Sequence, residues 1–137
     1  MLERGLSRES QAEFYSQVHL TPKPNNKWRF CVDYRNLNTV SEGMGWPIPN
    51  ISQMLQRLGQ HRPKYFAKLD LTSGYHQAPL AANSRLYTAF ITFMGIFEWL
   101  RAPMGLKGAP SYLQQVMATV VLAGLMYIIC ELYLDEF

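Results

Sequence analysis

The run 64–77, KYFAKLDLTSGYHQ, constrains the fold most because its apolar and polar side chains alternate. This period of two predicts an extended strand over Tyr65–Leu71, with Asp70 near its end on the face opposite the apolar side chains. A second apolar run, Leu125–Leu134, is followed directly by Asp135 and Glu136. If the two runs lie side by side as strands, three carboxylates meet at their ends.

Three carboxylates held together cannot all stay ionised without a counter-charge. Hard divalent cations with oxygen ligands supply that charge, and carboxylates of this kind hold Mg²⁺ in polymerase sites. Asp70, Asp135 and Glu136 are therefore the candidate metal ligands and catalytic residues. Acidic residues are common at strand ends, so the surrounding sequence has to decide between this chemistry and ordinary surface carboxylates.

The rest of the chain mixes strands and helices without strict alternation, which is typical of an α+β domain. Helix signals are clearest after Asn50, a predicted N-cap, with Gly59 as the predicted end. The other expected elements are a strand over Trp28–Arg35 after a turn at Pro22–Asn26, a loop over Thr39–Gly45, a hairpin of Leu86–Phe93 with Ile96–Leu100, a helix over Tyr112–Val121 ending at Ala123-Gly124, and a buried strand over Leu125–Leu134.

Composition excludes several classes of protein. The 137 residues suffice for one domain with a core, and 48% hydrophobic content argues against disorder. All 13 Lys and Arg lie at or before Lys107, so a basic body precedes an acidic end, which suits a surface that binds phosphates. Cys31 and Cys130 lack metal-ligand spacing and are expected to be free thiols. The apolar run Val116–Cys130 falls short of the roughly 20 residues of a membrane span, so we expect no membrane partner.

Four blocks of sequence resemble the reverse transcriptase domain of gypsy-type LTR retrotransposons. They read WRFCVDYRNLN at Trp28–Asn38, KLDLTSGYHQ at Lys68–Gln77, GLKGAPSYLQ at Gly105–Gln114 and YLDE at Tyr133–Glu136. Their order and approximate spacing are those of the family. The resemblance covers nearly the whole chain, and an unrelated small α+β interaction protein would require four ordered matches to be accidental.

The resemblance implies the fingers and part of the palm of a right-handed polymerase. Carried over, the fingers are roughly residues 1–42 and 78–108, and the palm is roughly residues 43–77 and 109–137. The implied activity is RNA-directed DNA polymerisation by two Mg²⁺ ions, with Mn²⁺ as an alternative metal. The implied partners are an RNA or DNA template with its primer and deoxynucleoside triphosphates. Such elements copy themselves in cytoplasmic particles.

The resemblance also implies a nucleotide site. Arg29 and Lys23 are the expected triphosphate contacts, and a solvated surface charge is the alternative for each, more so for Lys23 than for Arg29. Tyr75 is expected under the incoming sugar, where its ring would reject a 2′-hydroxyl; the alternative is a core tyrosine at a turn. Leu71 and Met104 are further expected nucleotide contacts. We interpret His76 as a packing residue, and Asp33 and Arg35 as partners that hold the fold.

Some residues depart from the family pattern. Glu136 replaces the second aspartate of the terminal motif, which moves its carboxylate by about 1 Å, a shift that can cost about a hundredfold in rate. Glu131 falls in a predicted buried strand, where an unpaired carboxylate is costly. The family's thumb and RNase H segments have no counterpart here. We therefore expect feeble or no polymerase activity from this chain alone, with a non-catalytic nucleic-acid-binding remnant of a decayed element as the alternative.

Overall fold

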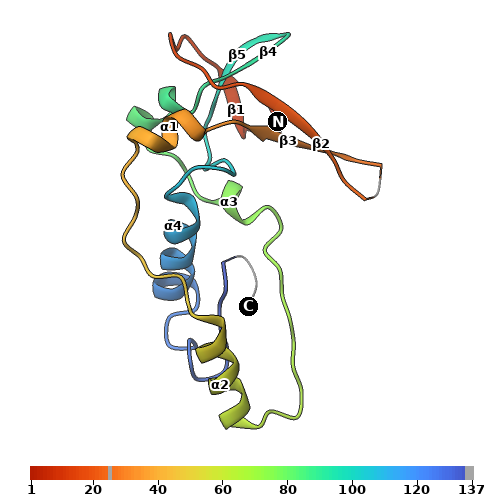
Figure 1. The fold of residues 1–137 in the computed structure, drawn as a ribbon, viewed down its shortest axis with the longest axis vertical. Helices are drawn as coiled ribbons and strands as arrows, with labels where there is room; N and C mark the ends of the chain where they lie inside the picture. Colours follow the sequence, from red (N-terminus) through yellow and green to blue (C-terminus); the bar gives the residue numbers. More distant parts are fainter. Residues whose placement is uncertain (25, 135–137) are drawn as a thin grey trace. The chain divides into compact units, whose positions relative to one another are not determined.

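The computed structural model describes residues 1–24 and 26–134, and the chain divides into two compact units (Figure 1). Unit 1 comprises Met1–Gly43 and Tyr75–Ala109, and unit 2 comprises Met44–Gly74 and Pro110–Phe137. The chain combines helices with antiparallel strands, which confirms the predicted α+β class.

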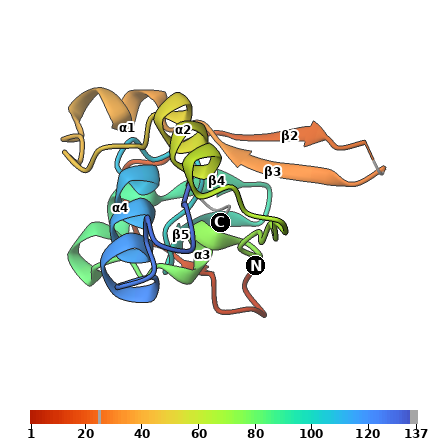
Figure 2. The same cartoon turned by 90° about the horizontal axis from the view of Figure 1, so that it is seen from below.

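Unit 1 contains all the named strands. A three-stranded antiparallel sheet has the order β1-β5-β4, and a separate hairpin pairs β2 with β3. Figures 1 and 2 both show this hairpin extending to one side of the three-stranded sheet. The strand bounds are β1 Ser7–Glu9, β2 Val18–Pro22, β3 Trp28–Val32, β4 Phe90–Thr92 and β5 Gly95–Trp99.

The core of unit 1 is aromatic and joins the sheet to the hairpin. Tyr34, Phe90, Phe97 and Trp99 are buried together, and half-buried apolar side chains pack around them. Phe30 of β3 packs edge-on against Phe90, with ring centroids 5.4 Å apart. Edge-to-face packing of this kind is the geometry that aromatic quadrupoles favour. The alternating run that starts at Trp28 therefore forms a strand because one of its faces meets this core.

The helices of unit 1 are short, and two of them correct the sequence predictions. Helix α1 occupies Arg35–Val40, so the predicted loop at Thr39–Gly45 begins later than expected. The first part of the predicted strand Leu86–Phe93 is a 3₁₀ turn, η2 (Leu86–Thr88), and another, η1 (Ala82–Ser84), precedes it. The predicted hairpin around Met94-Gly95 is confirmed in shorter form, because Thr92 pairs with Gly95 at φ +128°.

Unit 2 contains two helices that the sequence predicted. Helix α2 spans Ile51–His61, and the Asn50 side chain accepts hydrogen bonds from the amides of Ser52 and Gln53, which confirms the N-cap. The helix ends at the left-handed residue Arg62 rather than at Gly59. Helix α4 spans Ala109–Val116 and continues as one π-helical turn, η3 (Met117–Val121), before Gly124 at φ +78°.

Two predicted strands are wrong. Residues 65–69 form no strand, and Tyr65 is 90% exposed. The run Leu125–Leu134 forms no strand: it folds as turns as far as Cys130, with Tyr127 at φ +65° and Ile129 77% exposed, and continues without regular structure. A strand is stable only beside a hydrogen-bonded neighbour, and among the described residues no named strand pairs with either run. The alternation of apolar and polar residues could not show that these runs lack a neighbouring strand.

Candidate functional site

Asp70 lies in unit 2 at the end of the irregular run 65–69. Its side chain is exposed, and the residue makes a single β-bridge. The half-buried Leu71 follows, and its carbonyl accepts a hydrogen bond of 3.2 Å from the amide of Gly74. This tight turn contains Ser73 at φ +54°. It ends the extended run directly after Asp70.

Asp135 and Glu136 lie outside the described residues, so the predicted meeting of three carboxylates stays a prediction. Within residues 1–24 and 26–134, no group of three or more His, Cys, Asp or Glu side chains is placed to hold a metal. The chemistry of Asp70 is suited to Mg²⁺, because an exposed carboxylate offers the hard oxygen ligands that this ion prefers. Asp70 is the one predicted metal ligand that the described part of the chain contains.

Glu131 is not the unpaired carboxylate that the sequence suggested. Arg57 of α2 donates from Nε to Oε1 at 2.6 Å and from Nη2 to Oε2 at 2.8 Å, while the Glu131 side chain is only 9% exposed. The Arg57 guanidinium also lies 4.7 Å from the centroid of the Tyr127 ring. The hydrogen bonds to Glu131 raise the pKa of Arg57 above its ordinary value. A forked pair of this geometry gives each carboxylate oxygen a charged hydrogen-bond partner.

A buried glutamine fixes the backbone just before Asp135. The Gln114 side chain, 1% exposed on α4, donates to the carbonyl of Leu132 at 3.2 Å and accepts from the amide of Leu134 at 2.8 Å. Both partners belong to unit 2. The sequence offered a signal for this residue, since Gln114 ends the block GLKGAPSYLQ, but a role for it was not predicted.

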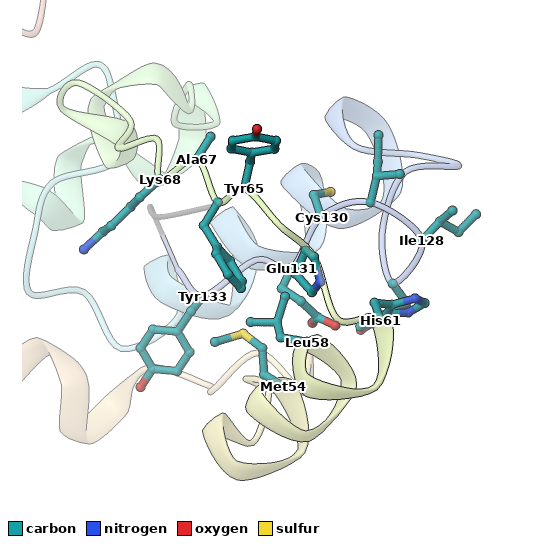
Figure 3. Close-up of a pocket in the computed structure, with 14 residues that line it drawn as sticks. Met54, Leu58, His61, Tyr65, Ala67, Lys68, Ile128, Cys130, Glu131 and Tyr133 are labelled. Carbon is teal, nitrogen blue, oxygen red and sulfur yellow. The ribbon is translucent and has the colours of Figure 1, made fainter.

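Unit 2 also has a cavity of about 540 Å³ beside α2 (Figure 3). In Figure 3, Glu131 lies over the helix near Leu58, and Tyr133 borders the same space. The lining is mostly apolar, with Met54, Leu58, Tyr65, Phe66, Ile128 and Ile129 among the residues that form it. The turns at 125–130 thus cover a cavity instead of forming a strand.

The two expected triphosphate contacts lie on the β2–β3 hairpin of unit 1. Arg29 is exposed on β3 and pairs in register with Thr21 of β2. The amide of Lys23 donates to the carbonyl of Lys27 at 2.7 Å, which closes the end of the hairpin. The exposed side chains of Lys23, Lys27 and Arg29 therefore gather at one end of a single hairpin. The predicted turn at this position is confirmed.

The segment that holds Tyr75 is joined to the segment that precedes Met104. Helix α3 (Gly74–Gln77) carries Tyr75, which is half-buried. His76 stacks on Trp99 with centroids 5.1 Å apart, and its Nδ1 lies 3.1 Å from the carbonyl oxygen of Ala102. Burial lowers the pKa of His76, although the contact with that carbonyl opposes the shift. His76 is thus confirmed as a packing residue.

Met104 lies in a loop that is anchored to α1. The Asn38 side chain donates to the carbonyl of Gly105 at 2.8 Å and accepts from the amide of Lys107 at 2.8 Å. Gly105 has φ +96°, and a Cβ there would meet the Tyr34 ring and the carbonyl of Val32 at 3.6 Å. Met104 itself is 51% exposed. The loop is therefore well fixed while the Met104 side chain stays accessible.

Asp33 and Arg35 form the pair that was expected. The Arg35 guanidinium donates to both carboxylate oxygens of Asp33, with a shortest contact of 2.7 Å. These hydrogen bonds lower the pKa of Asp33 to about 2. Cys31 and Cys130 are free thiols, as predicted. Within the part of the chain that the structure describes, no helix is long and apolar enough to cross a membrane.

An α+β chain with an exposed Asp70 and a basic hairpin is consistent with an enzyme that acts on nucleic acids. Comparison with known proteins identifies the family. Residues 21–137 match the family "Reverse transcriptase (RNA-dependent DNA polymerase)". The chain belongs to the reverse transcriptase family.

Its relatives are retrotransposon polyproteins. The chain is 39% identical over 141 residues to the retrovirus-related Pol polyprotein from transposon 297 of Drosophila melanogaster, which covers 99% of the chain. It is 34% identical over 142 residues to the Pol polyprotein from transposon gypsy of the same organism, again over 99% of the chain. The chain spans only 13% of each of these relatives. It is therefore a reverse transcriptase segment of the retrotransposon polyprotein type.

Solved structures show the same fold. The crystal structure of the prototype foamy virus protease-reverse transcriptase matches 98% of the chain with a TM-score of 0.85 at 24% identity, and the chain covers 18% of it. The foamy viral protease-reverse transcriptase in complex with an RNA/DNA hybrid matches with a TM-score of 0.78 at 22% identity, over 98% of the chain and 18% of that structure. These likenesses confirm the predicted fold.

Proposed function

We propose that this chain provides the fingers (roughly residues 1–42 and 78–108) and part of the palm (roughly residues 43–77 and 109–137) of an RNA-directed DNA polymerase. The observation that carries the proposal is the family match over residues 21–137, within which the block around Asp70 stands at Lys68–Gln77. The proposed partners are a primed RNA or DNA template and deoxynucleoside triphosphates. The remainder of a polyprotein would supply a thumb and an RNase H domain.

Phosphoryl transfer requires positioning and charge neutralisation more than covalent chemistry by the protein. Asp70, Asp135 and Glu136 would hold two Mg²⁺ ions, or Mn²⁺ ions in their place. Bound there, the metal would lower the pKa of the primer 3′-hydroxyl and neutralise charge on the phosphates. The exposed carboxylate of Asp70 supports its part in this site.

The chain's own side chains would bind and orient the nucleotide. Arg29 and Lys23, exposed at one end of the hairpin, would neutralise the triphosphate. Tyr75 would lie under the sugar and exclude a 2′-hydroxyl, while Leu71 and Met104 would contact the nucleotide. The fixed loop around Gly105 supports a positioning role for Met104, because a bound nucleotide needs a preorganised surface.

Metal binding tests this proposal even if the chain alone is inactive. We expect the 137-residue chain to bind Mn²⁺ in electron paramagnetic resonance titrations, and Asp70→Asn to weaken that binding by at least about tenfold, as loss of a direct ligand should. Glu13→Gln, which neutralises another exposed carboxylate, is the matched control. Equal Mn²⁺ affinity in Asp70→Asn and the unaltered chain would contradict the proposed site.

Primer extension tests the activity itself. Because Glu136 departs from the family pattern, we expect the isolated chain to extend a DNA primer on an RNA template feebly or not at all. Mg²⁺-dependent synthesis at the rate of a complete polymerase, abolished by Asp70→Asn, would overturn that expectation while supporting the family function.

The second candidate is a non-catalytic nucleic-acid-binding remnant, and the basic end of the hairpin favours it. Lys23, Lys27 and Arg29 are exposed there together with Trp28, which is 65% exposed and available to stack on a base. Binding of a primer–template without turnover would support this function. Each lost phosphate contact should then reduce the salt slope of binding by about 1, so Arg29→Gln is compared with Arg4→Gln, a change at another exposed arginine.

A further inference from the structure

The chain segment that leads to Asp135 is held in an unfavourable backbone conformation at both of its ends. Tyr127 has φ +65° and Leu134 has φ +60°, a region that bulky side chains rarely adopt. Such conformations persist only where the surroundings over-determine them. In unit 2, side chains from two helices contact the segment 127–134 at these points.

From α2, Arg57 contacts the segment twice. Its guanidinium lies 4.7 Å from the centroid of the Tyr127 ring and forms the forked pair with Glu131 at 2.6 and 2.8 Å. The cation–π contact and the ion pair together fix the five residues 127–131 on the helix surface. Figure 3 shows Glu131 over this helix, beside Leu58 and Met54.

From α4, Gln114 holds the end of the same segment. Its side chain bonds the carbonyl of Leu132 and the amide of Leu134, and Leu134 is the residue directly before Asp135. Only the fully buried Leu132 and the half-buried Tyr133 separate Glu131, which Arg57 holds, from Leu134, which Gln114 holds. A displacement of Glu131 would therefore reach Leu134, the last described residue, through a very short length of chain.

We propose that the Arg57–Glu131 pair is a positioning latch, which fixes the segment 127–134 on α2 so that Asp135 is presented for metal binding. Arg57 and Glu131 are positioning residues, since neither is proposed to touch the metal or the substrate. The metal-binding role of Asp135 rests on the proposed function. The anchoring of the segment 127–134 does not depend on that function.

A positioning latch and a simple electrostatic effect predict opposite results for one variant. If Arg57 acted only through its positive charge, Arg57→Gln would strengthen cation binding nearby, and Glu131→Gln would weaken it. If the pair positions the segment, both variants weaken cation binding. The double reversal Arg57→Glu with Glu131→Arg should restore much of it, because a pair of opposite charges is re-formed.

The experiment measures Mn²⁺ affinity and amide hydrogen exchange on the 137-residue chain. We expect Arg57→Gln and Glu131→Gln each to weaken Mn²⁺ binding by about tenfold, the lower end of the losses seen when groups that orient metal ligands are removed. Faster exchange is expected at the Leu134 amide, while the Leu122 amide of unit 2, bonded to the Met117 carbonyl at 2.8 Å, reports that the rest of this unit stays folded.

Each outcome decides between the proposals. Tighter Mn²⁺ binding by Arg57→Gln, or unchanged exchange at Leu134 in both single variants, would overturn the latch. If the unaltered chain binds no Mn²⁺, the proposed metal site fails, and the exchange measurement alone then tests the latch. Arg57→Lys keeps the positive charge but loses the forked hydrogen bonds, so the Leu134 amide should exchange at an intermediate rate. A variant that also loses protection at Leu122 is replaced by Arg57→Lys.

Discussion

Gln114 offers the sharpest test of how the backbone before Asp135 is stabilised. Gln114→Met keeps an unbranched side chain of similar size but removes both hydrogen-bonding groups. The Leu132 carbonyl, in a residue with 0% exposure, then loses its partner, as does the amide of the half-buried Leu134. The variant tests whether these two hydrogen bonds stabilise unit 2.

The size of the effect follows from these two groups. A buried polar group left without a partner costs about 1–3 kcal/mol. The Leu132 carbonyl should approach the upper value, whereas water can partly replace the bond to Leu134. We therefore expect Gln114→Met to lower the free energy of unfolding by about 2–4 kcal/mol.

Urea denaturation followed by circular dichroism measures this change, with equal m-values as the sign that both chains unfold alike. Gln115→Met is the matched control, because it makes the same replacement at the next position of α4, where the side chain is only half-buried. A loss below about 1 kcal/mol in Gln114→Met, or an equal loss in both variants, would refute the reasoning, since neither fits a group left unpaired.

Three further changes test other parts of the fold. Tyr34→Phe removes the 2.8 Å bond from the buried hydroxyl to the Thr88 carbonyl and should cost about 1–2 kcal/mol in urea denaturation; no loss would mean that water satisfies the carbonyl. Asn50→Ala removes the N-cap of α2 and should cost about 1 kcal/mol, whereas Asn50→Asp should cost little; equal thermal stability of the two variants would contradict the cap. Burial lowers the pKa of His76 from 6.5, so its contribution to stability is present above pH 6.5 and is lost as the pH falls through the lowered pKa. His76→Phe should therefore flatten the loss of melting temperature below pH 6.5, and an unchanged pH profile would contradict this assignment.

The candidate site was accessible to sequence reasoning only in part. The family resemblance pointed to Asp70, Arg29 and Lys23. The lack of a second suitably spaced histidine indicated a packing role for His76. Asn38 and Gln114 were missed, although both lie in the motif blocks, because nothing in a motif shows that a side-chain amide bonds backbone far away. Arg57 had no sequence signal at all, since Glu131 is 74 positions away along the chain.

Several features could be predicted correctly from sequence because they depend on local chemistry. The turn at Pro22–Asn26, the Asn50 cap and the tight turn before Gly95 depend on residues only a few positions apart, so their patterns are readable without a fold. The order of the motif blocks likewise determined the family. These features need no knowledge of which distant segments meet.

Tertiary structure decided whether alternating runs become strands and which charges are paired. Trp28–Val32 forms a strand because β2 hydrogen-bonds to it and the aromatic core covers one face, whereas the equally alternating run 65–69 has no named strand beside it in the described chain. Glu131 became a paired carboxylate only because α2 brings Arg57 within 2.6 Å. The physical reason is the same in both cases: sheet hydrogen bonds and ion pairs join residues far apart in sequence, so only the folded chain can provide the partner.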